Sequence, residues 1–132
     1  MVYGKNHSGH SNILKIVREK LEKGEEYNVF DDQVRTPTYV EDLAKGIVSI
    51  IEKKATGVFH ISGKDVLTPY QMTIKTAEHL TLDSSVIKKV TAASFSQPAK
   101  RPLKTGLIID KARKELGYEP IGFEEGLRKT LS

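Results

Sequence analysis

The sequence contains no cysteine, and it has no long apolar run. Without cysteine the chain can form neither a disulfide framework nor a thiolate metal site, and it offers no cysteine nucleophile. This composition is typical of a protein of the reducing cytoplasm, which is the location we expect. A helix that spans a bilayer needs about 20 consecutive apolar residues, and none occur, so we expect no membrane partner. No apolar leader follows Met1, and the sequence therefore predicts no secretory signal.

The motifs of several common chemistries are also missing. There is no G-x-x-x-x-G-K-[ST] loop and no glycine-rich turn between a strand and a helix, so no segment is suited to hold the phosphates of a dinucleotide. Ser/His/Asp catalysis lacks its Gly-x-Ser-x-Gly elbow. His7 and His10 form a single pair, whereas a zinc site needs three or four converging ligands. We therefore expect no catalytic residue, no bound cofactor and no metal in this chain.

With 132 residues, the chain has the length of one domain and is too short for an enzyme with separate cofactor and substrate domains. Its net charge of +4 comes entirely from residues 67–132, which hold 11 basic and 7 acidic side chains. Residues 86–114 alone carry a net +7. Such a segment favours an anionic partner, or is a solvated surface. Nucleic acid is the less favoured partner, because Phe95 is the single aromatic residue of that segment.

The residue patterns predict five helices and two or three short strands, so the fold class is α/β or α+β. Strands are expected at Tyr27–Phe30 and at 57–62, where the strand is mostly buried and Gly63 forms a turn. An irregular segment is expected at 86–106. Helices are expected at 11–23, 39–54, about 69–81, 110–116 and 123–131.

Cap and turn residues mark the ends of these helices. Ser11 and Asp110 are expected N-caps, and Gly24 and Gly117 are expected ends. Capping boxes are predicted for the pairs Thr38/Glu41 and Thr68/Gln71, the second with Pro69 at the first helical position. In the helix at 39–54, Lys53 and Lys54 are expected in the last turn. Its apolar residues share one face, which comprises Val40, Leu43, Ala44, Ile47, Val48 and Ile51.

Two arginines lie next to prolines at the boundaries of these elements. Arg35 precedes Pro37 and the helix at 39–54, and Arg101 precedes Pro102 in the irregular segment. The planar guanidinium is permanently charged and matches two phosphate oxygens at once. From the residues alone, the two arginines are either phosphate ligands or solvated surface cations.

Several segments together resemble the extended short-chain dehydrogenase/reductase family. Asp32-Gln33-x-x-x-Pro37-Thr38-Tyr39-Val40-x-Asp42-Leu43 is similar to its dTDP-4-dehydrorhamnose reductase branch. A second block is similar to the same branch, and it consists of Gly57-Val58-Phe59-His60-Ile61-Ser62-Gly63 followed by Thr68-x-Tyr70-x-Met72. A third block resembles the C-terminal signature of the family, and it consists of Arg101-Pro102, then Asp110 to Pro120, and then Phe123-Glu124-Glu125-Gly126-Leu127. Val2-Tyr3-Gly4 resembles the end of the family strand that precedes this region. The blocks occur in family order over almost the whole chain.

The resemblance implies that residues 1–132 are the C-terminal substrate-binding domain of such a reductase. Its partner would be a nucleoside-diphosphate sugar, and NADP or NAD would bind to an N-terminal Rossmann domain that this chain lacks. In epimerase-like members of the family, arginines at the positions of Arg35 and Arg101 bind the diphosphate. Asn12 resembles an asparagine that reaches the nucleotide, and Val29 and Phe30 correspond to backbone along the base.

The chain also departs from the family. It lacks the glycine-rich cofactor turn and the Tyr-x-x-x-Lys pair, so we expect no hydride transfer by this chain alone. Arg35 stands where many rhamnose-pathway reductases have glycine. That difference leaves open an epimerase/dehydratase-like fragment, or a non-catalytic module like the regulatory β subunit of methionine adenosyltransferase. A sheet without its Rossmann partner would expose strand edges, so self-association is expected.

Overall fold

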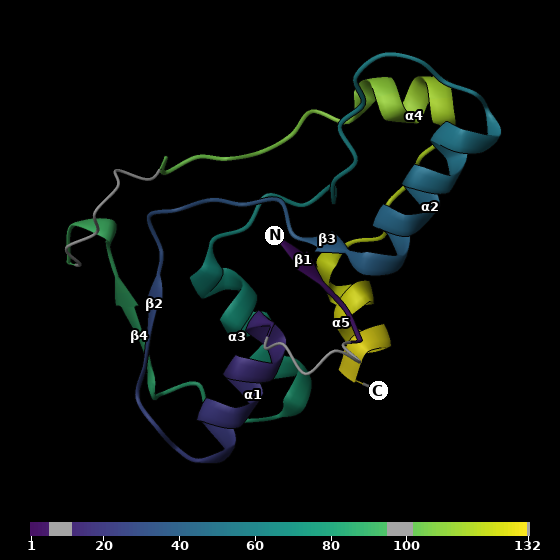
Figure 1. Cartoon of the computed structure of the whole chain (residues 1–132). Helices are drawn as coiled ribbons and strands as arrows, with labels where there is room; N and C mark the ends of the chain where they lie inside the picture. Colours follow the sequence, from purple (N-terminus) through teal and green to yellow (C-terminus); the bar gives the residue numbers. More distant parts are fainter. Residues whose placement is uncertain (6–11, 95–101, 132) are drawn as a thin grey trace. The chain divides into compact units, whose positions relative to one another are not determined.

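The computed structural model describes residues 1–5, 12–94 and 102–131 (Figure 1). The chain forms two compact units, and each is built from separate stretches of sequence. Unit 1 comprises Met1–Lys5, Thr36–Asp65 and Gly106–Ser132. Unit 2 comprises Asn6–Arg35 and Val66–Thr105. The fold class is α/β, mainly helical with short parallel strands, as the sequence predicts.

Unit 2 is a two-stranded parallel sheet packed against two helices. Strand β2 (Tyr27–Phe30) pairs with β4 (Ile87–Val90) along its whole length, and the two strands lie side by side in Figure 1. Helices α1 (Ile13–Glu22) and α3 (Pro69–Leu80) complete the unit. Their contact with the sheet excludes water from a small apolar core. The buried members of this core are Val17, Leu21, Val29, Ala77 and Ile87.

The ends of α1 and α3 follow from local signals. The predicted capping box of α3 is confirmed: Gln71 N donates to Thr68 Oγ1 at 3.1 Å, and Thr68 N donates to Gln71 Oε1 at 2.8 Å. For α1 the N-cap is Asn12, and Ser11 lies outside the described residues. Gly24, with a φ of +63°, follows the end of α1 as expected.

Strand β4 corrects the prediction of an irregular segment from residue 86 onward. Its four residues place one buried isoleucine and one half-buried valine around two exposed lysines, so no apolar alternation marks it as a strand. It forms because β2 supplies a parallel partner that is remote in sequence. A short 3₁₀ helix, η1 (Ala92–Ser94), follows it.

Unit 1 combines a minimal parallel pair, β1 (Val2–Tyr3) and β3 (Thr38–Tyr39), with three helices. The helices are α2 (Val40–Glu52), α4 (Asp110–Leu116) and α5 (Phe123–Leu131). One buried cluster joins α4 to the segment around Tyr118. A second is aromatic: the ring centroid of Tyr3 lies 5.8 Å from that of Tyr39 and 5.1 Å from that of Phe123.

The ends of the unit 1 helices agree only in part with the predictions. The capping box Thr38/Glu41 is wrong, because Thr38 belongs to β3 and its hydroxyl bonds the carbonyl oxygen of Thr36 and the N–H of Gly63. Lys53 is the C-cap of α2, and Lys54 follows it with a φ of +49°, so neither lies in the last turn.

Helix α4 has Ile109 as its N-cap, and Asp110 lies in its first turn. Its end at Gly117, a left-handed residue with a φ of +68°, is confirmed.

The apolar face of α2 is exposed, although its pattern is that of an amphipathic helix. The helix turns Asp42 and Gly46 inward instead. Asp42 Oδ2 accepts the N–H of Ile121 at 2.8 Å, and a Cβ on Gly46 would lie 2.6 Å from a methyl carbon of Ile61. A polar anchor and a close approach therefore decide the orientation of α2. The exposed members of the apolar face are Val40 (38%), Ile47 (48%), Val48 (48%) and Ile51 (69%).

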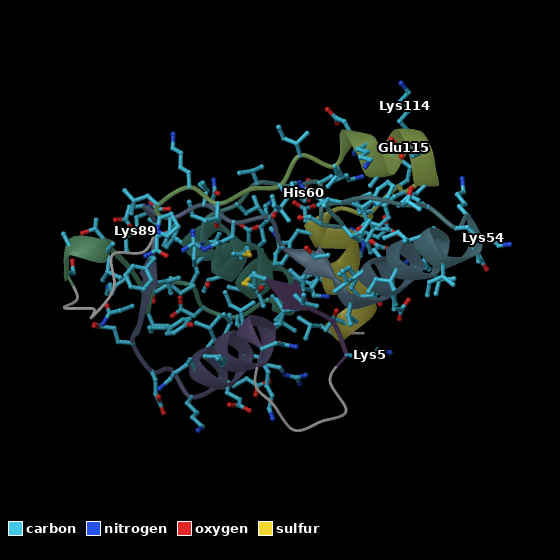
Figure 2. The ribbon with its side chains drawn as sticks, turned by 45° about the horizontal axis from the view of Figure 1, so that its top comes forward. Lys5, Lys54, His60, Lys89, Lys114 and Glu115 are labelled. Carbon is cyan, nitrogen blue, oxygen red and sulfur yellow. The ribbon has the colours of Figure 1, made fainter. Side chains whose placement is uncertain are left out.

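Residues 57–62 do not form the mostly buried strand that the sequence predicts. Val58 is 77% exposed, whereas Ser62 and Gly63 are buried. No strand within the described residues pairs with this segment, so it lacks the ladder that defines a strand. Figure 2 shows His60 on it, between α2 and α3 in the sequence.

Candidate functional site

The candidate site lies in unit 2, where the parallel strands β2 and β4 reach their carboxyl ends. Ligands of open parallel sheets bind outside this end of the strands. Asp31 and Asp32 directly follow β2, and Ala92 opens the 3₁₀ turn shortly after β4. Gln33 and Arg35 come next along the chain from β2.

Asp31 joins three elements of the unit. Its Oδ1 accepts the hydroxyl of Thr68, the N-cap of α3, at 3.0 Å, and its Oδ2 lies 2.9 Å from Lys89 Nζ on β4. The hydrogen bond from Lys89 lowers the pKa of Asp31 below its usual value. Lys89, labelled in Figure 2, also lies over the ring of Tyr70, 4.4 Å from its centroid. The charge of Lys89 is therefore balanced within the protein.

Asp32 links β2 to the turn after β4. Its Oδ2 accepts the N–H of Ala92 at 2.7 Å. Its Oδ1 is buried and has no hydrogen-bond partner among the residues that the structure describes. The adjacent carboxylates thus have different tasks, because Asp31 contacts a cation and a hydroxyl while Asp32 holds a backbone turn.

The backbone of Arg35 is fixed on both sides. Arg35 N donates to the carbonyl oxygen of Leu67, and Leu67 N donates to that of Arg35, both at 2.9 Å. Val34 N donates to the carbonyl oxygen of Leu103 at 2.7 Å, and Thr105 N donates to that of Val34 at 3.1 Å. Residues 34–35 therefore lie between the segment before α3 and the segment that begins at residue 102.

The half-buried side chain of Arg35 bonds neutral acceptors. Nη1 donates to the carbonyl oxygen of Val34 at 2.8 Å, and lies 3.4 Å and 3.5 Å from those of Leu103 and Pro102. Nη2 donates to Oε1 of Gln33, which is 5% exposed. No carboxylate pairs with Arg35 within residues 1–5, 12–94 and 102–131. Its charge is therefore not balanced there, in contrast to that of Lys89.

Asn12, Val29 and Phe30, which are also predicted site residues, fall in the same unit. Arg101 lies outside the described residues, and it immediately precedes Pro102 in the chain. Asn12 caps α1, with its Oδ1 accepting the N–H of Lys15 at 3.1 Å. Its acceptor oxygen therefore serves the helix.

Val29 and Phe30 face different surroundings. The side chain of Val29 is 3% exposed in the core, and that of Phe30 is half-buried. Tyr27 N and Asp31 N donate to carbonyl oxygens of β4, at 3.0 Å and 3.1 Å. Because alternate residues of a strand face the same neighbour, the backbone of Val29 also faces β4, and that of Phe30 faces the opposite edge of β2.

The residue pattern predicts Arg35 as a site residue, but it does not indicate the contact of Arg35 with Gln33 or that of Asp32 with Ala92. Gln33 and Asp32 appear only as letters of a family motif, and nothing in their spacing indicates a contact with Arg35 or Ala92. The pair His7 and His10 lies outside the described residues, among which no group of three or more His, Asp or Glu side chains could hold a metal ion. None of the described helices is long and apolar enough to cross a membrane.

Comparison with known proteins gives a consistent result. The pattern that defines the RmlD substrate binding domain matches residues 1–132. A dTDP-4-keto-6-deoxy-D-glucose reductase of Streptomyces niveus is 35% identical over 121 residues, which cover 91% of this chain and 40% of that protein. Methionine adenosyltransferase 2 subunit beta of Danio rerio is 27% identical over 138 residues, covering 99% and 43%.

The fold is that of solved reductases. The crystal structure of dTDP-4-dehydrorhamnose reductase from Bacillus anthracis, in complex with NADP, matches with a TM-score of 0.84 and 26% identity. The match covers 97% of this chain and 44% of that one. The chain thus spans less than half the length of the relatives that it matches.

Proposed function

Because the chain belongs to the RmlD substrate-binding-domain family, we propose that it holds the nucleoside-diphosphate sugar in an NAD(P)-dependent nucleotide-sugar reductase of the dTDP-4-dehydrorhamnose reductase kind. In this proposal Arg35 and Arg101 bind the diphosphate. Asn12 and the backbone at Val29 and Phe30 contact the nucleotide.

The observation that carries the proposal is that the charge of the Arg35 side chain is not balanced by a carboxylate among the described residues. A half-buried guanidinium without a carboxylate partner among the described residues retains a full positive charge for an anion. It lies just beyond the carboxyl end of a parallel strand, where ligands of such sheets bind. Pro102, whose carbonyl oxygen lies 3.5 Å from Nη1, directly follows Arg101 in the chain, which supports a joint role for the two arginines.

The nucleotide contacts are assigned by side-chain chemistry. Asn12, whose oxygen caps α1, is proposed to lie near the nucleotide. A contact with Val29 would be made by its backbone, since its side chain is buried in the core. Phe30 has its backbone directed to the edge away from β4, which favours it over Val29 as the residue along the base.

The nicotinamide cofactor would belong to another part of the whole protein. The Bacillus anthracis reductase, which is more than twice as long, is solved with NADP. We propose an N-terminal NADP- or NAD-binding domain for the whole protein and no hydride transfer by residues 1–132 alone, because hydride transfer requires the cofactor beside the substrate. A cytoplasmic location stays a prediction.

The exposed face of α2 is proposed as a contact surface. Four large apolar side chains on one helix, each at least 38% exposed, make an unusual patch for a water-facing helix. β1 is paired only with β3 among the described strands. We expect the isolated chain to self-associate through this face and edge.

The match to methionine adenosyltransferase 2 subunit beta favours a second candidate, a non-catalytic regulatory module. That candidate predicts a stable complex with a methionine adenosyltransferase catalytic subunit in sedimentation velocity, and no binding of dTDP. A reductase or an epimerase-like domain predicts the reverse.

Calorimetry with dTDP, UDP and thymidine tests the proposed function. A charge-assisted contact is worth about 1.5–3 kcal/mol, so Arg35→Ala and Arg101→Ala should each weaken dTDP binding about 10- to 100-fold. Thymidine binding should change little, because it carries no phosphate. Arg18→Ala is the matched control, since Arg18 is an exposed arginine of unit 2 that pairs with Glu22. Equal effects of Arg18→Ala and Arg35→Ala would refute the proposal.

A further inference from the structure

Gln33 is a buried polar side chain beside the only arginine that the proposed site offers within residues 12–94 and 102–131. It is 5% exposed, and its Oε1 accepts a hydrogen bond from Arg35 Nη2. Burying an amide without a partner is costly, so this contact is needed to keep the amide in place. The same bond sets the rotation of the guanidinium. This one hydrogen bond thus gives the buried amide of Gln33 a partner and orients the charged guanidinium of Arg35.

Counting the donors of Arg35 shows what this orientation leaves available. A guanidinium has five N–H groups. The two on Nη1 face the carbonyl oxygen of Val34 and those of Leu103 and Pro102, and one on Nη2 faces Gln33. The Nε hydrogen and the second Nη2 hydrogen have no acceptor among the described residues. We take the Gln33 bond to use the Nη2 hydrogen on the Nη1 side, so that the Nε and Nη2 hydrogens left over share one edge, the arrangement that binds two phosphate oxygens.

The backbone of Arg35 cannot supply this orientation by itself. Its two hydrogen bonds with Leu67 fix the Cα, but several rotatable bonds separate the Cα from the guanidinium. The contacts with Leu103 and Pro102, at 3.4 Å and 3.5 Å, are long. Gln33 and the adjacent carbonyl oxygen of Val34 are the close acceptors.

We propose that Gln33 is a positioning residue of the diphosphate site, which holds the guanidinium of Arg35 with its Nε/Nη2 edge directed to the ligand. The inference rests on the proposed function, since it names the group that makes Arg35 effective. Gln33 does not contact the ligand in this account. Its effect on binding should therefore pass through Arg35.

A double-mutant cycle measured by calorimetry with dTDP tests this route. Gln33→Met keeps the volume and removes the acceptor, and it should weaken dTDP binding about 5- to 10-fold when Arg35 is present. In the Arg35→Ala background the same change should alter binding less than about twofold. A merely structural Gln33 would give the same loss in both backgrounds, and that result overturns the inference. Unchanged binding by Gln33→Met alone, with Arg35→Ala impaired, also overturns it.

A second variant covers poor folding of Gln33→Met, which thermal melting would reveal. Gln33→Glu keeps both volume and acceptor, but it places a negative charge beside Arg35 and repels the diphosphate. It should weaken dTDP binding more than about 10-fold while thymidine binding is retained. Retained dTDP affinity in Gln33→Glu overturns the inference. Unchanged dTDP affinity in Arg35→Ala would refute both the proposed diphosphate site and the role of Gln33. Reduced affinity in Arg35→Ala with unchanged affinity in both Gln33 variants would refute only the role of Gln33.

Discussion

Gly63 lies where two backbone segments of unit 1 meet at close range. A Cβ at this position would lie 1.8 Å from the carbonyl oxygen of Pro37, whereas side-chain carbons essentially never come within 3.0 Å of another atom. In Gly63→Ala the segments must separate by about 1.2 Å, the difference between 3.0 Å and 1.8 Å. Two buried hydrogen bonds join the same segments: Gly63 N to Thr38 Oγ1 at 3.0 Å, and Ser62 Oγ to Thr36 Oγ1 at 2.8 Å.

The cost of this substitution has two parts. Overpacking of a well-filled interior destabilises by about 1–3 kcal/mol, and a clash with backbone belongs at the upper end of that range. Each buried hydrogen bond that is lost adds about 1 kcal/mol. Gly63→Ala should therefore lower the free energy of unfolding by about 3 kcal/mol or more, and lower the melting temperature by about 10 °C.

Gly106→Ala is the matched control in the same unit. A Cβ there would lie 3.6 Å from Thr36 Cγ2, which is ordinary contact, so the free energy of unfolding should change by less than about 0.5 kcal/mol. Urea unfolding followed by circular dichroism measures both variants. Equal midpoints for Gly63→Ala and Gly106→Ala would refute the packing described for unit 1.

Three further predictions concern α3, the strand ends and α2. Thr68→Ala should lower the free energy of unfolding by about 1–2 kcal/mol in urea titrations and Thr68→Ser should not, because the hydroxyl caps α3. The hydrogen bond from Lys89 lowers the pKa of Asp31, so the pair stabilises the folded chain above the ordinary aspartate pKa of about 4 and loses this effect as pH falls through the lower folded value. The loss of unfolding free energy in Asp31→Asn should therefore shrink below pH ~4. A loss that does not depend on pH would contradict this. The double variant Ile47→Glu/Ile51→Glu should shift the isolated chain toward monomer in light scattering, whereas an unchanged mass would exclude α2 as the self-association surface.

The elements predicted correctly are those with local signals. The capping box and proline at the start of α3, and the left-handed glycine after α4, depend on residues within a few positions of one another. Strand β4 depends on a partner some 60 residues away, as the register of Tyr27 with Ile87 shows. Its two exposed lysines leave no alternation of apolar and polar residues that would mark it as a strand. Local patterns therefore predict β2 and the start of α3 but not β4, and they misplace the N-caps of α2 and α4.

The face of α2 shows a second limit. Periodicity correctly indicates which apolar residues of α2 share a face, but it does not say what covers that face. Asp42 and Gly46 decide the orientation through Ile121 and Ile61, which are distant in sequence.

The site repeats this pattern. Arg35 was predicted from its chemistry, whereas Gln33 acquires its role only from the loop conformation that brings its oxygen to the guanidinium.

A crystal structure of the chain with dTDP tests the proposed diphosphate site most directly. Diphosphate oxygens are expected at about 2.7–2.9 Å from Arg35 Nε and Nη2, the usual range for charge-assisted hydrogen bonds, with Gln33 Oε1 still bonded to Arg35. Density for the diphosphate away from the carboxyl end of β2, with Arg35 bonded only to carbonyl oxygens and Gln33, would contradict it.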